Sequence, residues 1–191
     1  MFLNKKFRKV EKELNQDKIY VVGSDGDAII NVKADEKGQV FSSYNFESNE
    51  KLNDELSDFI YDKAKDVPAN KDIKIKIFTD FKADEKEVQD AIKNNYKKEY
   101  INLKSEMKRN YIFSAVMFVL GIVTLTLLLL MHSWFYNFYL EIILEIATWV
   151  FIWEAVDSFF LQRAQLKRKC LTMLKLYSAE INIVNLKTFS K

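Results

Sequence analysis

Hydrophobic and polar residues alternate with a period of two in several short stretches of this chain, which is typical of β-strands. Apolar runs separated by turn signals such as Asp-Gly predict a three-stranded β-meander over residues 18–44, with Gln39–Tyr44 as its last strand. Residues 73–77 alternate isoleucine with lysine, so this strand is expected to be covered on one face and wet on the other. Residues 180–186 predict an added strand of the sheet.

Other stretches carry apolar residues every three or four positions, which is typical of helices. Residues 52–60 predict a short helix, and residues 1–17 predict an amphipathic helix. A capping box at Asp84 opens a helix with no Gly or Pro before Gly121, so one long helix is expected to leave the soluble domain. Together these elements predict an α+β fold in which residues 18–104 form a cytosolic two-layer α/β domain of order β-β-β-α-β-α.

Two longer apolar stretches are expected to form a transmembrane helical hairpin. Residues 111–131 carry no charge over 21 positions. At about 1.5 Å per residue they match the bilayer's hydrocarbon core of about 30 Å. Residues 138–158 are also apolar but include four acids, and residues 132–137 are expected to be the extracytoplasmic turn. The competing interpretation of residues 138–158 is an amphipathic helix on the membrane surface, which would leave the following basic cluster on the outer side.

Basic residues gather at the far ends of both stretches and are absent from the turn between them. Under the positive-inside rule this places both termini in the cytoplasm, and the first residues show no apolar signal-peptide core. Residues 159–191 are expected to form a cytosolic basic helix and tail. The charges predicted at the membrane interface are Lys108, Arg109, Glu154, Asp157, Arg163, Lys167, Arg168 and Lys169. The excess of lysine over arginine is typical of AT-rich bacterial genomes, so the bacterial inner membrane is the predicted location.

Small and polar residues within the two stretches predict a contact between them. With the turn centred near Trp134, Glu145 is expected opposite Thr124, and Ala147 opposite Gly121. Glu145 then has two interpretations. It is either a protonated carboxyl hydrogen-bonded to Thr124 or, in an oligomer, part of a ring around a path for cations or protons. The predicted intramembrane polar residues are Glu141, Glu145, Thr124 and Thr148, and the predicted helix-packing residues are Ser114, Gly121 and Ala147.

Sequence motifs for catalysis are missing from the chain, which has no Gly-rich phosphate loop, GxSxG or HExxH. The single histidine, His132, and the single cysteine, Cys170, are expected on opposite sides of the membrane. We therefore expect a protein that is not an enzyme and needs no cofactor or metal. The expected partners are the lipid bilayer, further copies of the chain, and an unidentified cytosolic protein or small ligand, but not nucleic acid.

Two functions remain open on the sequence alone. The favoured one is a membrane anchor that oligomerises a cytosolic partner-binding or ligand-sensing domain. The alternative is an oligomeric cation or proton channel, or a membrane-permeabilising assembly, that uses Glu141 and Glu145.

Overall fold

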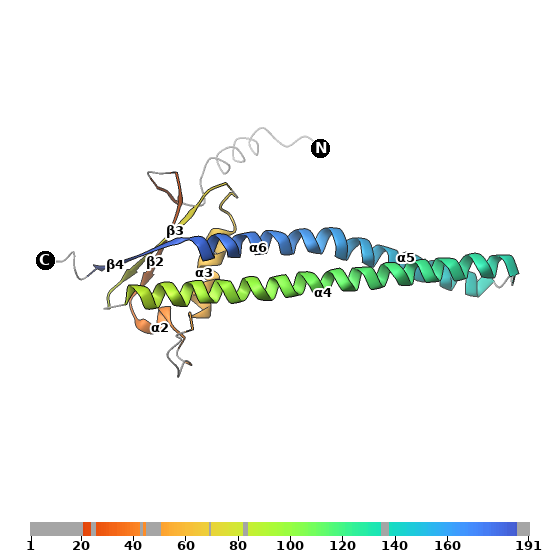
Figure 1. Cartoon of the computed structure of the whole chain (residues 1–191), viewed down its shortest axis with the longest axis horizontal. Coiled ribbons are helices and arrows are strands. Elements are labelled where there is room, and N and C mark those ends of the chain that lie inside the picture. Colours follow the sequence, from red (N-terminus) through yellow and green to blue (C-terminus); the bar gives the residue numbers. More distant parts are fainter. Residues whose placement is uncertain are drawn as a thin grey trace, which may run out of the picture. The chain divides into compact units, whose positions relative to one another are not determined.

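The chain folds into two compact units. A computed structural model describes residues 21–23, 26–42, 44, 51–68, 70–81, 84–134 and 138–186 (Figure 1). One unit, called the sheet unit here, comprises Met1–Lys98 and Thr172–Lys191, and the other, the helical unit, comprises Glu99–Leu171. The amphipathic helix expected over residues 1–17 lies outside the described residues.

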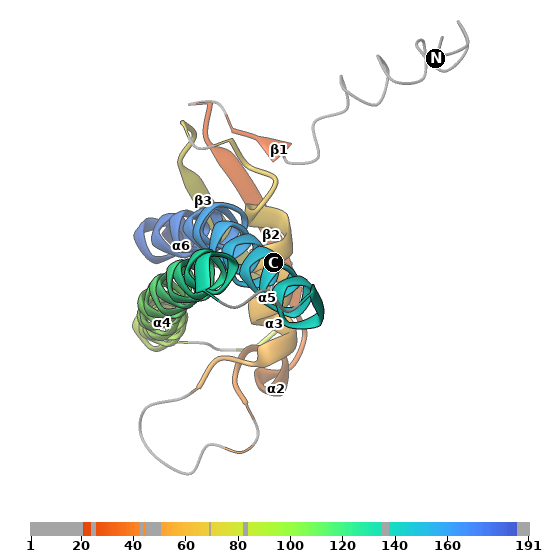
Figure 2. The ribbon, with the colours of Figure 1, turned by 90° about the vertical axis from the view of Figure 1, so that its right-hand side faces the viewer.

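Four strands form the sheet of the sheet unit, in the order β1-β2-β3-β4 (Figures 1 and 2). Their bounds are Val21–Val22 for β1, Ala28–Ala34 for β2, Ile73–Thr79 for β3 and Glu180–Asn185 for β4. Strand β1 pairs antiparallel with β2, whereas β2, β3 and β4 run parallel, with Ile75 beside Ile30 and Ile181. The predicted C-terminal strand is therefore confirmed.

The prediction of a strand over Gln39–Tyr44 is wrong. Its first residues belong to a short helix, α2 (Lys37–Val40), and Phe41 makes only an isolated bridge outside the sheet. The Gln39 side chain explains the difference, because its Oε1 accepts a hydrogen bond of 2.7 Å from the backbone N–H of Asp35. A local bond of this kind closes a helical turn in competition with a strand.

The buried core of the sheet unit lies on one face of the sheet. Residues Ile73, Ile75 and Ile77 are buried, while Lys74 and Lys76 between them are partly exposed, which confirms the predicted one-sided strand. Helix α3 (Asp54–Ala64), the first turns of α4 (Glu85–Trp134) and the last turns of α6 (Arg163–Ser178) supply further buried side chains. They include Leu56, Ile60, Val88, Ile92, Tyr96, Met173 and Leu176.

Connections between the parallel strands explain why residues so distant in sequence share one sheet. Parallel neighbours cannot be joined by a tight turn and need a crossover. Helices α2 and α3 connect β2 to β3, whereas α4, α5 (Phe138–Val156), the π-helix η1 (Asp157–Gln162) and α6 connect β3 to β4. The whole helical unit is thus an insertion within a single crossover.

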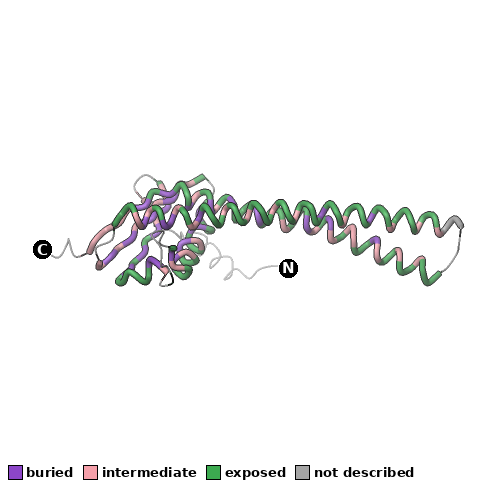
Figure 3. Tube along the Cα trace, turned by 60° about the horizontal axis from the view of Figure 1, so that its bottom comes forward, coloured by how far each residue is buried: buried purple, intermediate pink, exposed green. Residues whose placement is uncertain are grey.

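Helix α4 is continuous from Glu85 to Trp134, which confirms the predicted long helix. Asp84 caps its start, because Asp84 Oδ1 accepts a 3.1 Å hydrogen bond from the N–H of Lys86. Among the described helices, α4 alone is long and apolar enough to cross a membrane, and only 11% of its most apolar stretch is buried. Exposed residues dominate α4 and α5 in Figure 3. Helix α5 has the length but carries three glutamates, so a second span stays a prediction.

Candidate functional site

Within the helical unit, α4 and α5 run antiparallel along a narrow seam of small and polar residues. On α4 the seam side chains are less exposed than their neighbours and recur every three or four residues, the spacing of a helix–helix contact. They are Ser114, Met117, Gly121, Thr124 and Leu128. The stripe predicted from the sequence on the first helix is therefore the face that α4 turns toward α5.

A pair of threonine hydroxyls lies at the middle of the seam. Thr148 Oγ1 lies 3.0 Å from Thr124 Oγ1 and 2.8 Å from the backbone oxygen of Leu144. Thr124 Oγ1 lies 3.0 Å from the backbone oxygens of Leu120 and Gly121. Each hydroxyl has one proton, so Thr124 donates to its own helix while accepting from Thr148. The pair joins the helices without leaving a polar group unsatisfied.

The register of this contact differs from the expected one. Thr148, rather than Glu145, lies opposite Thr124, because α4 continues to Trp134 and α5 begins at Phe138. Thr124 is therefore 10 residues from the end of α4 at Trp134, and Thr148 is 10 residues from the start of α5 at Phe138. The Glu145 side chain is consequently exposed on the outer surface of α5.

The other residues predicted in the seam differ in how far their side chains are buried. Glu141 and Ala147 are partly exposed, and Ile152, not Ala147, is the neighbour of Gly121. A Cβ atom added to Gly121 would lie 2.8 Å from Ile152 Cγ1. The glycine is therefore what allows α4 and α5 to approach closely at this level.

Toward the end of α5 the seam becomes a polar lock, formed by Asn110 of α4 with Ser158 of η1. Asn110 Nδ2 donates to the Ser158 backbone oxygen, and Ser158 Oγ donates to Asn110 Oδ1, both at 3.1 Å. One turn away, Ser114 Oγ donates to the Ala155 backbone oxygen at 2.9 Å. Ser158 is only 1% exposed, whereas Asn110 is half-buried, so the serine side of the lock is shielded from solvent.

Four of the charges predicted at the membrane interface are Lys108, Arg109, Glu154 and Asp157. Of these, Asp157 lies in the π-helix, and its Oδ2 accepts a 2.9 Å hydrogen bond from Gln162 Nε2. A π-helix places residues five apart on the same face, which brings these two side chains together. No ion pair joins the four charged residues within the part of the chain that the structure describes.

An exposed collar of cations surrounds this end of the helical unit. Its members are Lys108, Arg109, Arg163, Lys167, Arg168 and Lys169, and all six are exposed. The guanidinium of Arg163 lies 5.3 Å from the ring centre of Phe159, a cation–π distance. Phe159 belongs to the exposed apolar surface, so charged and apolar residues meet at this level. Contact of the collar with lipid headgroups stays a prediction.

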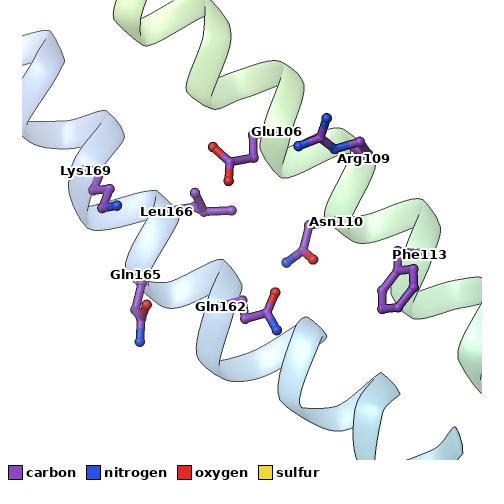
Figure 4. Close-up of a pocket in the computed structure, with 8 residues that line it drawn as sticks. All are labelled: Glu106, Arg109, Asn110, Phe113, Gln162, Gln165, Leu166 and Lys169. Atoms are coloured by element: carbon purple, nitrogen blue, oxygen red, sulfur yellow. The ribbon is translucent and has the colours of Figure 1, made fainter.

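Beside the polar lock is a cavity of about 430 Å³ that the sequence did not reveal. Its lining residues are Glu106, Arg109, Asn110, Phe113, Gln162, Gln165, Leu166 and Lys169. In Figure 4, Glu106 and Asn110 point from α4 toward the opposite helix, and Gln162 points back toward α4. The only sign of this cavity in the sequence is that amide and charged residues replace apolar ones, at helical spacing, where the apolar stretches of the two helices end.

Cys170 lies close to this region, but its thiol is expected to be a poor nucleophile. Its Sγ is buried 3.6 Å from Met107 Sδ, and burial raises the pKa of the thiol, with a smaller contribution from the Glu106 carboxylate. The thiolate needed for nucleophilic chemistry is therefore disfavoured. The side chain of His132 lies outside the described residues.

A second cavity, of about 500 Å³, opens in the sheet unit at the carboxyl end of β2. Its lining includes Lys33 and Asp35, whose Nζ and Oδ1 are 2.8 Å apart, together with Gln39, Asn53 and Phe59. The hydrogen-bonded partner raises the pKa of Lys33 and lowers the pKa of Asp35. The carboxyl ends of parallel strands are common ligand positions in α/β sheets, so this cleft is a candidate ligand site. The sequence did not indicate this cleft, because Gln39 was predicted in a strand rather than in α2.

The comparisons with known proteins gave no match to a family model, to a curated protein or to a solved structure.

Proposed function

We propose that α4 and α5 form a membrane-spanning hairpin that anchors the sheet unit at the cytoplasmic face of a bacterial inner membrane. The observation that carries this proposal is the apolar outer surface of both helices. Leu129 of α4 is 65% exposed, and Trp149 and Trp153 of α5 are each 67% exposed. Soluble monomers rarely expose contiguous apolar patches beyond a few hundred Å², whereas lipid requires such a surface. The hydrogen-bonded seam supports the same proposal, because polar groups inside a bilayer must be satisfied internally.

A pair of outward lysine substitutions tests the membrane span. Val119→Lys in α4 and Trp149→Lys in α5 each add a cation to the exposed apolar surface. On insertion scales, one lysine at the centre of a helix raises the free energy of membrane insertion by about 2.5 to 3.5 kcal/mol. We expect a fall in the fraction of the chain that resists alkaline extraction from membranes. Leu171→Lys, at an exposed apolar position outside both predicted spans, is the matched control. Full solubility of the wild-type chain without detergent would contradict the proposal.

Orientation is tested separately with two reporters. One is fused after Lys191 and the other is inserted at Ser133, near the end of α4. The collar of cations predicts a cytoplasmic signal from the first and an extracytoplasmic signal from the second. The opposite pattern would reverse the orientation, and two extracytoplasmic signals would replace the hairpin with a spanning α4 and a surface-bound α5.

Glu145 supports self-association of the proposed hairpin. In a single hairpin its exposed carboxyl would face hydrocarbon roughly 10 Å from the start of α5. Ionisable groups within membranes almost always face another helix or water. A second copy at this face supplies the polar surroundings. In detergent at equal protein concentration, Glu145→Leu is expected to shift the oligomer toward monomer, while Glu145→Gln retains hydrogen bonding and shifts it less. Ile143→Leu, on the same helix, is the control, and an unchanged size distribution for Glu145→Leu would count against this interface.

The same residue favours a second candidate function, a channel for cations or protons. In an oligomer joined through the outer face of α5, Glu145 and Glu141 would lie near a common axis. Liposomes containing the oligomer are expected to show cation or proton flux that Glu145→Gln reduces. Absence of flux from a correctly oligomeric sample removes the channel and leaves the anchor.

The cleft beside Lys33 and Asp35 supports a ligand-sensing role for the sheet unit. It offers an ammonium, a carboxylate and side-chain amides around a space of ligand size. A thermal-shift screen of the full chain against small polar metabolites is expected to yield a stabilising ligand. Lys33→Ala and Asp35→Asn should each weaken that stabilisation, whereas Lys97→Ala, at an exposed position of α4 outside the cleft lining, should not. A screen without any stabilising compound would favour a protein partner instead.

A further inference from the structure

The cavity beside the polar lock lies where the charged part of α4 gives way to its uncharged part. Glu106 and Arg109 precede the uncharged stretch that begins at Tyr111, and Phe113 lies within it. Arg109, Lys169 and Gln165 are exposed at the rim, and Leu166 and Phe113 supply the apolar wall. In a chain that spans the bilayer as proposed above, this level is the headgroup region. The volume of about 430 Å³ falls within the range of small-molecule sites.

The charges around the cavity indicate which charges a ligand must carry. Two cations, Arg109 and Lys169, and one carboxylate, Glu106, line the same space. Within the described residues, Arg109, Lys169 and Glu106 take part in no ion pair shorter than 4.0 Å. A purely anionic ligand would place its charge beside Glu106, and a purely cationic ligand would place its charge beside the two cations. A zwitterion with a phosphate and an ammonium group satisfies both signs at once.

Donor geometry narrows the ligand further. A guanidinium binds phosphate oxygens through two parallel N–H bonds, and a lysine ammonium adds a compact charge. A carboxylate accepts hydrogen bonds from a primary ammonium, which a quaternary choline group cannot donate. The amides of Asn110 and Gln162 are already engaged with Ser158 and Asp157, so they hold the wall in place.

We propose that this cavity binds the headgroup of a zwitterionic aminophospholipid of the ethanolamine type. Arg109 and Lys169 hold the phosphate, Glu106 holds the ammonium, and the acyl chains continue along the apolar surface beyond Phe113. The inference rests on the proposed membrane span. It assigns a lipid-specific site to one end of the helical unit, in place of a general attraction between the collar and anionic lipids.

The test uses the full chain in vesicles that contain phosphatidylethanolamine, phosphatidylglycerol and phosphatidylcholine in equal amounts. Flotation of the vesicles first measures membrane association. Detergent extraction and native mass spectrometry then measure which lipid stays bound. We expect phosphatidylethanolamine to be retained above both other lipids. A chain that fails to float with the vesicles contradicts the proposed function itself. A chain that floats but retains phosphatidylglycerol equally well contradicts only the headgroup site.

Two variants separate the roles of the charges. Glu106→Gln is expected to lower the preference for phosphatidylethanolamine over phosphatidylglycerol by about tenfold, the effect of one charge-assisted hydrogen bond. Arg109→Lys keeps the charge but loses the paired donors and should weaken retention of all three lipids. Lys167→Ala, an exposed collar position outside the cavity, is the control. An unchanged lipid preference in a floating Glu106→Gln variant overturns the proposal.

Soluble glycerophosphoethanolamine distinguishes a lipid from a free ligand of the same chemistry. Because acyl chains contribute contacts along the apolar surface, we expect the soluble compound to displace the bound lipid only at large excess. Displacement at an equal concentration would overturn the lipid assignment.

Discussion

Hydroxyl groups at the centre of the seam provide the sharpest test at the residue scale. Thr148→Val removes the 3.0 Å contact with Thr124 but keeps the side-chain shape. Hydrogen bonds between membrane helices average about 0.6 kcal/mol and reach about 1.7 kcal/mol, so we expect a loss of stability in this range. Thr126→Val is a matched control, because Thr126 is exposed and bonds only to Ile122 of its own helix. Unfolding in mixed detergent micelles measures the stability of both variants. Equal losses of stability in the two would show that the interhelical hydrogen bond contributes nothing.

Close approach of the helices at Gly121 is the second residue-scale prediction. In Gly121→Ala the new methyl would lie 2.8 Å from Ile152 Cγ1, so α4 and α5 must separate or Ile152 must move. Overpacking of this kind typically costs about 1 to 3 kcal/mol. Ile152→Ala in the same chain removes the clash and should restore part of the lost stability. Val116→Ile, which adds a carbon on the exposed face of α4, is the control. Equal stability of wild type and Gly121→Ala would contradict the close contact.

The raised pKa of Cys170 predicts a dependence of stability on pH. Burial keeps the folded thiol protonated above its ordinary pKa of 9.0, while the unfolded thiol ionises there. Above pH 9.0 the unfolded chain therefore binds fewer protons, and the stability contributed by Cys170 falls as pH rises through the folded pKa. Between pH 7 and pH 10 the wild type should lose more stability than Cys170→Ala, as measured by chemical denaturation. Parallel losses in both proteins would show that the thiol titrates normally.

At the scale of single elements, helix faces were predictable but their register was not. Spacing alone identified the α4 stripe through Ser114, Gly121 and Thr124, since a contact face must recur every three or four residues. The partner of Thr124 depends on where the turn lies, and nothing local shows that α4 continues to Trp134. The expected partner of Thr124 was therefore displaced by three positions, from Thr148 to Glu145, and Glu145 lies on the surface rather than in the seam.

The π-helix η1 was not predicted from the sequence, and its Ser158 is held by Asn110 of α4, a residue 48 positions away. Asn110→Leu removes both 3.1 Å bonds and leaves the buried Ser158 hydroxyl with only a long 3.5 Å contact to Gln162 Oε1. We expect this to lower the free energy of unfolding by about 1 to 3 kcal/mol. We expect faster hydrogen exchange over residues 157–162 as well as lower stability. Gln165→Ala, an exposed amide on the adjoining helix, is the control. Unchanged exchange over these residues would show that η1 does not depend on the lock.

At the scale of the whole molecule, the fold was predictable where neighbours in the sequence are neighbours in space. The β1–β2 hairpin and helix α3 depend on local turns and caps, and both were predicted. The pairing of β3 with β4 joins residues about a hundred positions apart, so only the strand character of residues 180–185 was visible. The cleft beside Lys33 and the cavity beside Arg109 were missed for the same reason, because each collects side chains from separate elements.

This long-range pairing leads to a prediction about which fragments fold. Residues 1–104 contain β1, β2 and β3 but lack β4, so they leave one edge of β3 unpaired and omit the buried side chains of Met173, Leu176 and Ile181. They also lose the bond from Gln89 to the backbone oxygen of Ile181. Removing three large core residues from so small a unit costs several kcal/mol, comparable with the whole stability of a domain.

We therefore expect residues 1–104 to aggregate or to unfold without cooperativity. A chain in which residues 1–98 are joined to residues 172–191 by about ten Gly/Ser residues should instead give a soluble monomer. Circular dichroism during urea denaturation distinguishes them, and Ile181→Asp in the joined chain is the control that should abolish its transition. If residues 1–104 unfold as cooperatively as the joined chain, β4 is dispensable and the helical unit is a C-terminal appendage rather than an insertion in the sheet.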